Sequence, residues 1–103
     1  MHLSFLFSRR DNLAGRWIDA RTAQHGAIGG FVLSHDGNAK SINAASPQYT
    51  AWRRSGHTLT LWGNAHRAGQ TMQFIESLCI HELTDDKLIL SRADETFEYR
   101  RDG

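Results

Sequence analysis

Cys79 and His81 are residues whose types and spacing could support nucleophilic catalysis. Residues two apart in a strand share a face, with Cα atoms roughly 6.5–7 Å apart, so the thiol and the imidazole could approach each other. A hydrolase needs a nucleophile, a base and an orienting group held together, and this spacing supplies only two of the three. We therefore predict no catalytic residue and no enzyme activity.

The six histidines could suggest a metal site. No two of them have the i, i+2 spacing that puts both imidazoles on one face of a strand, or the i, i+4 spacing that does so on a helix. We therefore predict no metal ligand and no cofactor, and scattered surface positions for His2, His25, His35, His57, His66 and His81.

Aromatic side chains are the stronger candidates for a binding site. Pockets in proteins are lined mainly by apolar and aromatic side chains, with a few placed polar groups. Tyr49 and Trp52 are predicted to line such a pocket. Trp62 lies on the polar phase of its strand, where it marks either a half-exposed side chain or a surface for a partner.

Basic and aromatic residues also follow one another from Tyr49 to Arg54, a pattern that can bind single-stranded nucleic acid. Nucleic-acid-binding domains usually carry a clear excess of positive charge. Here Lys and Arg number 12 against 11 Asp and Glu, which gives a net charge of +1. We therefore predict no nucleic-acid partner, and we place Arg53 and Arg54 beside a solvated turn.

Antiparallel strands must position these side chains. Asp36-Gly37 lies between two strand-like runs, which is a strong hairpin signal and suits a type I′ turn. A two-residue loop there would set Phe31 opposite Ile42 and Leu33 opposite Lys40. The prediction is that Phe31, Leu33 and Ile42 all point inward.

Turn signals recur about every eight to twelve residues, as in β-sandwiches and β-barrels. We expect a tight hairpin at Ser55-Gly56, a two-residue connection at Asp85-Asp86 and a longer loop over 64–69. One or two helical turns are the alternative for 47–54. The predicted strands cover 15–21, 27–35, 38–44, 48–54, 57–63, 70–82, 87–92 and 95–100.

Alternation within these strands identifies the faces that form the core. The predicted inward pairs are Leu59 with Leu61, Leu88 with Leu90, and Phe97 with Tyr99.

Glu76 interrupts the apolar phase of the long strand, which also holds Met72, Phe74, Leu78 and Ile80. An ionised carboxylate buried without a partner is costly. Long strands in small barrels must bend, so we predict a bulge that turns Glu76 outward. If Glu76 instead points inward, it should meet an Arg, Tyr or His.

Length and composition indicate one domain with one core, since the chain has 103 residues of which 40% are apolar. We divide it into a terminal arm or short strand over 1–12 and a barrel over 13–103. The single Cys79 cannot form an intramolecular disulfide. The apolar start precedes Arg9-Arg10, the reverse of the order in a secretory signal, so we predict no signal peptide, no membrane span and, by default, a cytoplasmic protein.

Several motifs occur in order over residues 13 to 92: Gly15-Arg16-Trp17, Gly30-Phe31-Val32-Leu33, Asp36-Gly37-Asn38-Ala39, Tyr49-Thr50-Ala51-Trp52, Leu59-Thr60-Leu61 and Ile80-His81-Glu82-Leu83. In these motifs and their spacing the chain resembles the short bacterial lipocalin-like domain family. The resemblance implies an all-β fold, a single, mostly up-and-down antiparallel barrel of about eight strands. It also implies relatives that are often exported or lipid-anchored.

The resemblance further implies a structural role for Trp17. In lipocalins the Trp of the Gly-x-Trp element closes one end of the barrel and is crossed by a basic side chain from the end of the last strand. The matching cation here is Arg100 or Arg101.

Together these observations favour a non-enzymatic module that holds a small, largely apolar ligand, with Glu76 or the Tyr99 hydroxyl as polar anchor. The predicted ligand-binding residues are Tyr49, Trp52, Phe74, Glu76 and Tyr99. The alternative is a protein-interaction or dimerising barrel whose interior is filled by Met72, Phe74, Leu59, Leu61, Leu88 and Leu90. A cavity smaller than a few hundred cubic ångström would favour this alternative, because small barrels can be either filled or hollow.

Overall fold

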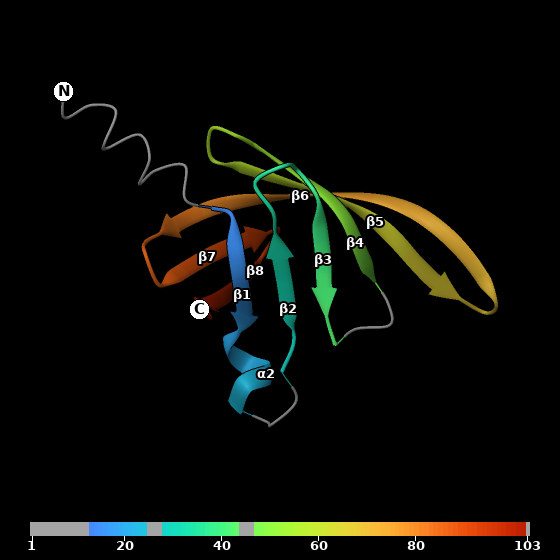
Figure 1. The fold of residues 1–103 in the computed structure, drawn as a ribbon, viewed down its shortest axis with the longest axis horizontal. Helices are drawn as coiled ribbons and strands as arrows, with labels where there is room; N and C mark the ends of the chain where they lie inside the picture. The colour runs from blue at the N-terminus through green and yellow to red at the C-terminus, as the bar shows by residue number, and fades with distance from the viewer. Residues whose placement is uncertain (1–12, 25–27, 44–46, 103) are drawn as a thin grey trace.

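Eight antiparallel strands form one nearly closed barrel in the computed structural model, as the sequence predicted (Figure 1). The structure describes residues 13–24, 28–43 and 47–102, so the predicted arm over 1–12 lies outside the described residues. The strands are β1 (Gly15–Asp19), β2 (Gly30–Leu33), β3 (Ala39–Ile42), β4 (Gln48–Ser55), β5 (Thr58–Arg67), β6 (Gln70–Leu83), β7 (Lys87–Arg92) and β8 (Glu95–Arg101).

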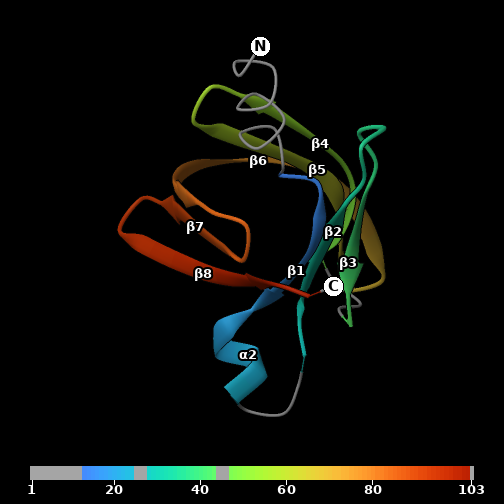
Figure 2. The same ribbon diagram turned by 60° about the vertical axis from the view of Figure 1, so that its left-hand side comes forward.

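The strand order is β3-β2-β1-β8-β7-β6-β5-β4, so β1 and β8 pair although they lie at opposite ends of the chain (Figure 2). Between β3 and β4 the barrel is closed by a single bridge, Asn38 to Ala51. Side chains reinforce this seam. The Ser41 hydroxyl donates to the Pro47 carbonyl and accepts from the Tyr49 amide, both at 2.9 Å.

The apolar core fills one end of the barrel. The leucine faces expected from alternation are buried there, because Leu59, Leu61, Leu88 and Leu90 have no exposed surface. Burying a leucine side chain stabilises a fold by roughly 1.5–3 kcal/mol, so this layer supplies much of the stability. Other buried members of the cluster are Leu13, Trp17, Phe31, Leu33, Leu78 and Ile80.

The hairpin at Asp36-Gly37 is present, but its register differs by one residue from the prediction. Phe31 pairs with Ser41, and Ile42 pairs with Gly30. The loop has three residues, because the Gly37 amide donates to the Ser34 carbonyl and Gly37 takes the positive φ of 93°. Ile42 is buried as predicted, although the register pairs it with Gly30 and not with Phe31.

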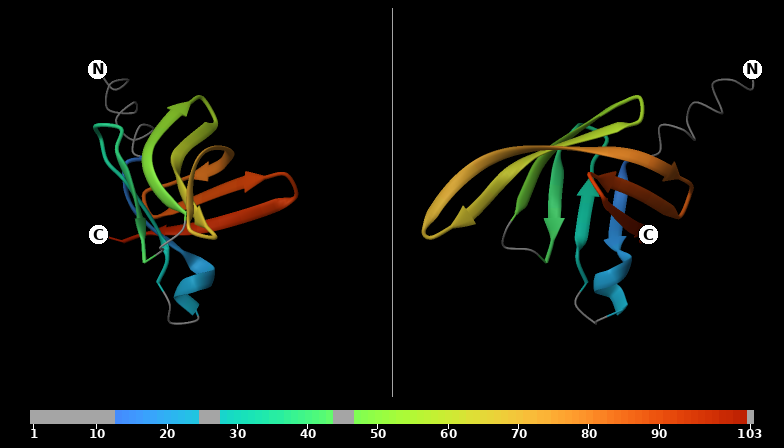
Figure 3. Two further views of the ribbon diagram at one scale, coloured as in Figure 1. Left: turned by 90° about the vertical axis from the view of Figure 1, so that its right-hand side faces the viewer. Right: turned by 180° about the vertical axis from the view of Figure 1, so that it is seen from behind.

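The hairpin between β5 and β6 is longer than the sequence suggested. The loop predicted over 64–69 is mostly strand, since β5 runs to Arg67 and only Ala68 and Gly69 form the turn, both with positive φ. β6 pairs with β7 only from Cys79 onward, so the earlier part of the hairpin projects past β7 and β8 (Figure 3). Met72 lies on this overhang and is 59% exposed, so it does not fill the interior.

A short helix, α2 (Ala20–Gln24), follows β1 where the sequence predicted continuing strand. Asp19 caps it, because the Asp19 carboxylate accepts a hydrogen bond of 2.9 Å from the Arg21 amide. The Thr22 hydroxyl then accepts from the Gly29 amide at 2.9 Å, which holds the helix against the start of β2. The helical alternative for 47–54 was wrong, since residues 48–54 belong to β4 and Pro47 precedes it.

Candidate functional site

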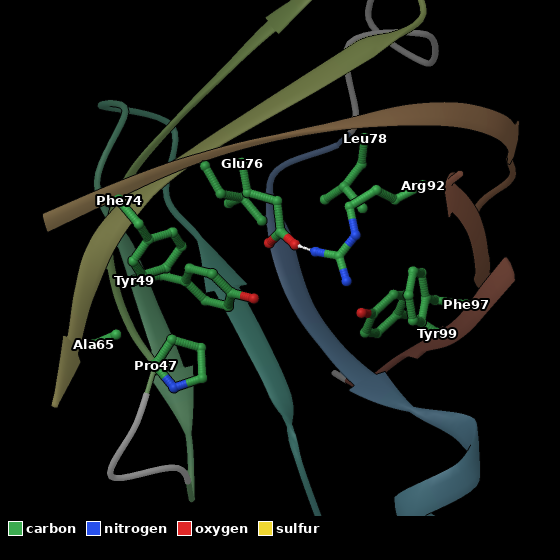
Figure 4. Close-up of a pocket in the computed structure, with 10 residues that line it drawn as sticks. Pro47, Tyr49, Ala65, Phe74, Glu76, Leu78, Arg92, Phe97 and Tyr99 are labelled. Carbon is green, nitrogen blue, oxygen red and sulfur yellow. Dashed lines mark ion pairs between the residues drawn. The ribbon is translucent and has the colours of Figure 1, made fainter. Parts of the chain in front are cut away.

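A cavity of about 440 Å³ occupies the other end of the lumen, beyond the leucine layer, and is partly open to solvent (Figure 4). Four of the five predicted ligand-binding residues surround it: Tyr49, Phe74, Glu76 and Tyr99. Its remaining lining residues are Pro47, Leu61, Ala65, Leu78, Arg92 and Phe97. A smaller hollow of about 140 Å³ shares Pro47, Tyr49 and Tyr99 with it.

Glu76 points into the lumen, so the predicted outward bulge was wrong. β5 and β6 pair regularly here, with Leu61 opposite Glu76. The bulge of β6 lies instead at His81, between the residues that pair with β7. The carboxylate, whose side chain is only 17% exposed, forms an ion pair with Arg92 (Figure 4). That partner offsets the desolvation which made an inward carboxylate look costly.

Aromatic rings form the walls of the cavity. The Tyr49 ring lies edge-on to Phe74, with 6.0 Å between centroids, and edge-on to Phe31 at 5.9 Å. The Tyr99 ring contacts Phe31 at 4.7 Å. Gly63 makes room for this packing, because a Cβ there would lie 2.9 Å from the Phe74 ring. Such ring pairs fix the shape of the wall.

The two tyrosine hydroxyls point toward each other across the space beside the Glu76–Arg92 pair (Figure 4). Within the described residues neither hydroxyl makes a hydrogen bond. Burial raises the pKa of Tyr49 above the ordinary 10.0. Burial also raises the pKa of Tyr99, and the neighbouring Tyr49 and Asp19 raise it further. Both hydroxyls are therefore protonated at neutral pH and can donate as well as accept.

Two guanidinium groups flank Phe97 at the rim. The guanidinium carbon of Arg21 lies 5.5 Å from the ring centroid and that of Arg92 lies 5.8 Å away. Arg21 also lies 3.7 Å from the Asp19 carboxylate. The Phe97 ring therefore lies between two guanidinium groups that each have a carboxylate partner.

Trp17 and Arg101 lie together at the filled end of the barrel. The Trp17 indole is fully buried and donates to the Leu13 carbonyl at 2.8 Å. The Arg101 guanidinium stacks 4.2 Å from the ring centroid and donates to the Ala14 carbonyl at 2.9 Å. Arg100 is not part of this arrangement, because its side chain points to the other face and pairs with Glu98 at 2.9 Å.

Trp52 lies outside the cavity, contrary to its place among the predicted ligand-binding residues. Its indole donates to the Ser34 carbonyl at 2.7 Å, and its backbone amide donates to the Gly37 carbonyl at 2.9 Å. These bonds tie β4 to the hairpin loop at the end opposite the cavity. We therefore leave Trp52 out of the binding site.

Arg92 and Phe97 were missed as site residues. Arg92 was given no role, although it continues the inward phase of Leu88 and Leu90. Phe97 was assigned to the core with Tyr99 and not to the cavity. The alternation of inward and outward side chains along each strand could therefore have identified both residues.

The lipocalin-like family profile matches residues 9–102. The chain belongs to the lipocalin-like family. A crystal structure of a lipocalin-like protein from Bacteroides thetaiotaomicron is similar to this lipocalin-like chain, with a TM-score of 0.81 and 28% sequence identity. The similarity covers 89% of this chain and 98% of the other. No match was found among curated proteins.

Two further structural properties of the lipocalin-like chain concern the described residues alone. None of their helices is both long enough and apolar enough to cross a membrane. Among these same residues there is also no group of three or more His, Cys, Asp or Glu placed to hold a metal ion.

Proposed function

We propose that this protein binds a small, largely apolar molecule in its lumen, without catalysing a reaction. The observation that carries the proposal is the cavity of about 440 Å³ walled by Tyr49, Phe74, Phe97 and Tyr99. Its volume falls within the range of roughly 300–1,000 Å³ that is typical of small-molecule sites. A cavity of this size supports ligand binding over the alternative of a filled interior.

The aromatic walls would contact the apolar part of the ligand, and the polar groups would hold its polar end. Rigid aromatic rings give a large contact area with little rotamer entropy to lose. Glu76 and the Tyr99 hydroxyl stand where an apolar ligand would present its polar end, so either can anchor it.

A titration with Nile red, an uncharged apolar dye, tests the proposal. We expect saturable binding that weakens in Ala65→Phe, because Ala65 lines the cavity and a phenyl group would occupy it. The matched control is His66→Phe, since the next residue of β5 is exposed. Equal binding by both variants, or no binding by the parent, would contradict the proposal. Native mass spectrometry of protein from its own host would then show any bound ligand.

Self-association is the second candidate function, and the overhang of β6 supports it. Within the described residues no strand pairs with the β7 side of β6 from Gln70 to Leu78. Exposed edges of this kind pair readily unless charge or proline protects them. The segment from Gln70 to Ile75 has neither, and Ile75 is 67% exposed. We propose an antiparallel pairing of β6 with β6 of a second copy.

Sedimentation equilibrium tests this pairing. A two-fold axis at Gln73 would place two introduced lysines opposite each other, so Gln73→Lys should lower the dimer fraction. Gln48→Lys, at the start of β4, is the control of equal charge. A parent protein that stays monomeric at every concentration would remove this candidate.

A further inference from the structure

Each guanidinium group around the cavity faces at least one carboxylate, so that two positive charges meet three negative ones. Glu76 and Arg92 are the charged residues that line it, and they form an ion pair. Arg92 also lies 3.6 Å from the Glu95 carboxylate. At the rim Arg21 lies 3.7 Å from Asp19. The binding site therefore has no uncompensated positive charge on these groups.

We infer that the ligand carries an uncharged head group that both donates and accepts hydrogen bonds, such as an alcohol or a primary amide. The inference rests on the proposed lumen-binding function and specifies the class of ligand. Its basis is the pair of tyrosine hydroxyls, which point into the cavity and make no hydrogen bond within the described residues. A hydroxyl or amide can donate to one of them and accept from the other.

A carboxylate head group fits this site poorly. The guanidinium of Arg92 is already engaged by Glu76 inside the lumen and lies near Glu95 at the rim. An entering carboxylate would meet the Glu76 carboxylate as a like charge. Displacing Glu76 from Arg92 would leave a carboxylate that is only 17% exposed without its partner, which is costly.

A cationic head group fits no better. The carboxylate of Glu76 already accepts from Arg92, so an ammonium group would have to compete with a guanidinium held in place. At the rim, Arg21 and Arg92 lie over the Phe97 ring that could otherwise bind a cation. The uncharged head group is thus the one that needs no existing ion pair to break.

Four ligands with the same ten-carbon chain test the inference: decanol, decanamide, decanoate and decylammonium. Affinities are measured at neutral pH by displacement of Nile red and by calorimetry. We expect decanol and decanamide to bind at least about tenfold more tightly than decanoate and decylammonium. Decanoate or decylammonium binding as tightly as decanol would overturn the inference.

A change in the preferred head group gives a second readout. Glu76→Gln releases Arg92 inside the lumen, so decanoate should gain about tenfold in affinity relative to decanol. The matched control is Glu95→Gln, because that carboxylate is 62% exposed at the rim and its loss should have a much smaller effect. An unchanged decanoate affinity in Glu76→Gln would contradict the role given to the ion pair.

The hydroxyls are tested separately. Tyr49→Phe together with Tyr99→Phe should weaken decanol and decanamide while Nile red still binds. If the parent binds neither Nile red nor any of the four ligands, the proposed function itself fails. If Nile red binds but the ranking is reversed, only the head-group inference fails. Should Glu76→Gln not fold, the ranking in the parent still decides.

Discussion

Glu76 of β6 and Arg92 of β7 form an ion pair beyond the point where their strands stop pairing. The last paired residues at this end are Cys79 and Ser91. From there β6 continues along β5, while β7 turns back into β8. The pair thus joins two strands across the lumen where backbone hydrogen bonds no longer do so, and both of its residues line the cavity.

The first prediction concerns the stability that this pair contributes. Arg92→Leu should lower the free energy of unfolding by about 1–3 kcal/mol, because it leaves a mostly buried carboxylate without a partner. In Arg92→Leu combined with Glu76→Leu the loss should be smaller, since no charge is then left unpaired. Urea unfolding of the parent, both single variants and the double variant measures this coupling. Strictly additive losses would show that the two side chains are independent.

The second prediction is that both tyrosines, the only two in the chain, lose their hydroxyl protons at a higher pH than an ordinary tyrosine does. Phenolate absorbance of the native protein should rise only above the ordinary pKa of 10.0, because burial favours the protonated forms. In the unfolded state both should titrate near that ordinary value. The unfolded state then releases more protons above pH 10.0, so stability should fall as pH rises beyond it. Native and urea-unfolded titrations that coincide would contradict burial of these side chains.

The third prediction concerns the loop at Gly37. Gly37→Val should cost at least about 1–2 kcal/mol, because the φ of 93° is strained for a β-branched residue. For a domain of this size each kcal/mol lowers the melting temperature by roughly 4–8 °C. His35→Val, in the same loop, is the control. If the two variants melt together, Gly37 does not have this conformation.

The fourth prediction separates two adjacent arginines at the filled end. Arg101→Leu should cost about 1–3 kcal/mol, since it removes a donor to the Ala14 carbonyl and the stack on Trp17. Arg100→Leu removes only an exposed ion pair with Glu98 and should change stability by less than about 1 kcal/mol. Chemical denaturation measures both, and a larger loss for Arg100→Leu would refute the assignment.

The strands were predictable because local patterns determine them. A period of two identified the leucine faces, and Gly and Asp dipeptides marked the turns. The same period also separates the arginines of β8, because Arg101 shares the phase of Phe97 and Tyr99, whereas Arg100 shares that of Glu98.

Features that depend on distant contacts were not predictable from local patterns. The inward direction of Glu76 depends on Arg92, which lies on another strand. The length of the β5–β6 hairpin depends on cross-strand pairing that continues through residues which look like a loop. The register at Gly37 depends on a three-residue loop, which carries the same Asp-Gly signal as the shorter one.

The barrel is a single sheet whose weakest strand boundary is the seam between β3 and β4, and local opening is expected there. One backbone bridge and the hydrogen bonds of Ser41 and Trp52 hold it, whereas neighbouring strands elsewhere in the sheet share three or more residue pairs. Local opening is easiest where fewest hydrogen bonds must break. Because the amide of Tyr49 bonds across the seam while its ring walls the cavity, an occupant of the cavity would hold the seam shut. Amide hydrogen exchange in β3 and β4 would then slow on binding. Exchange at this seam would therefore report whether the cavity is occupied.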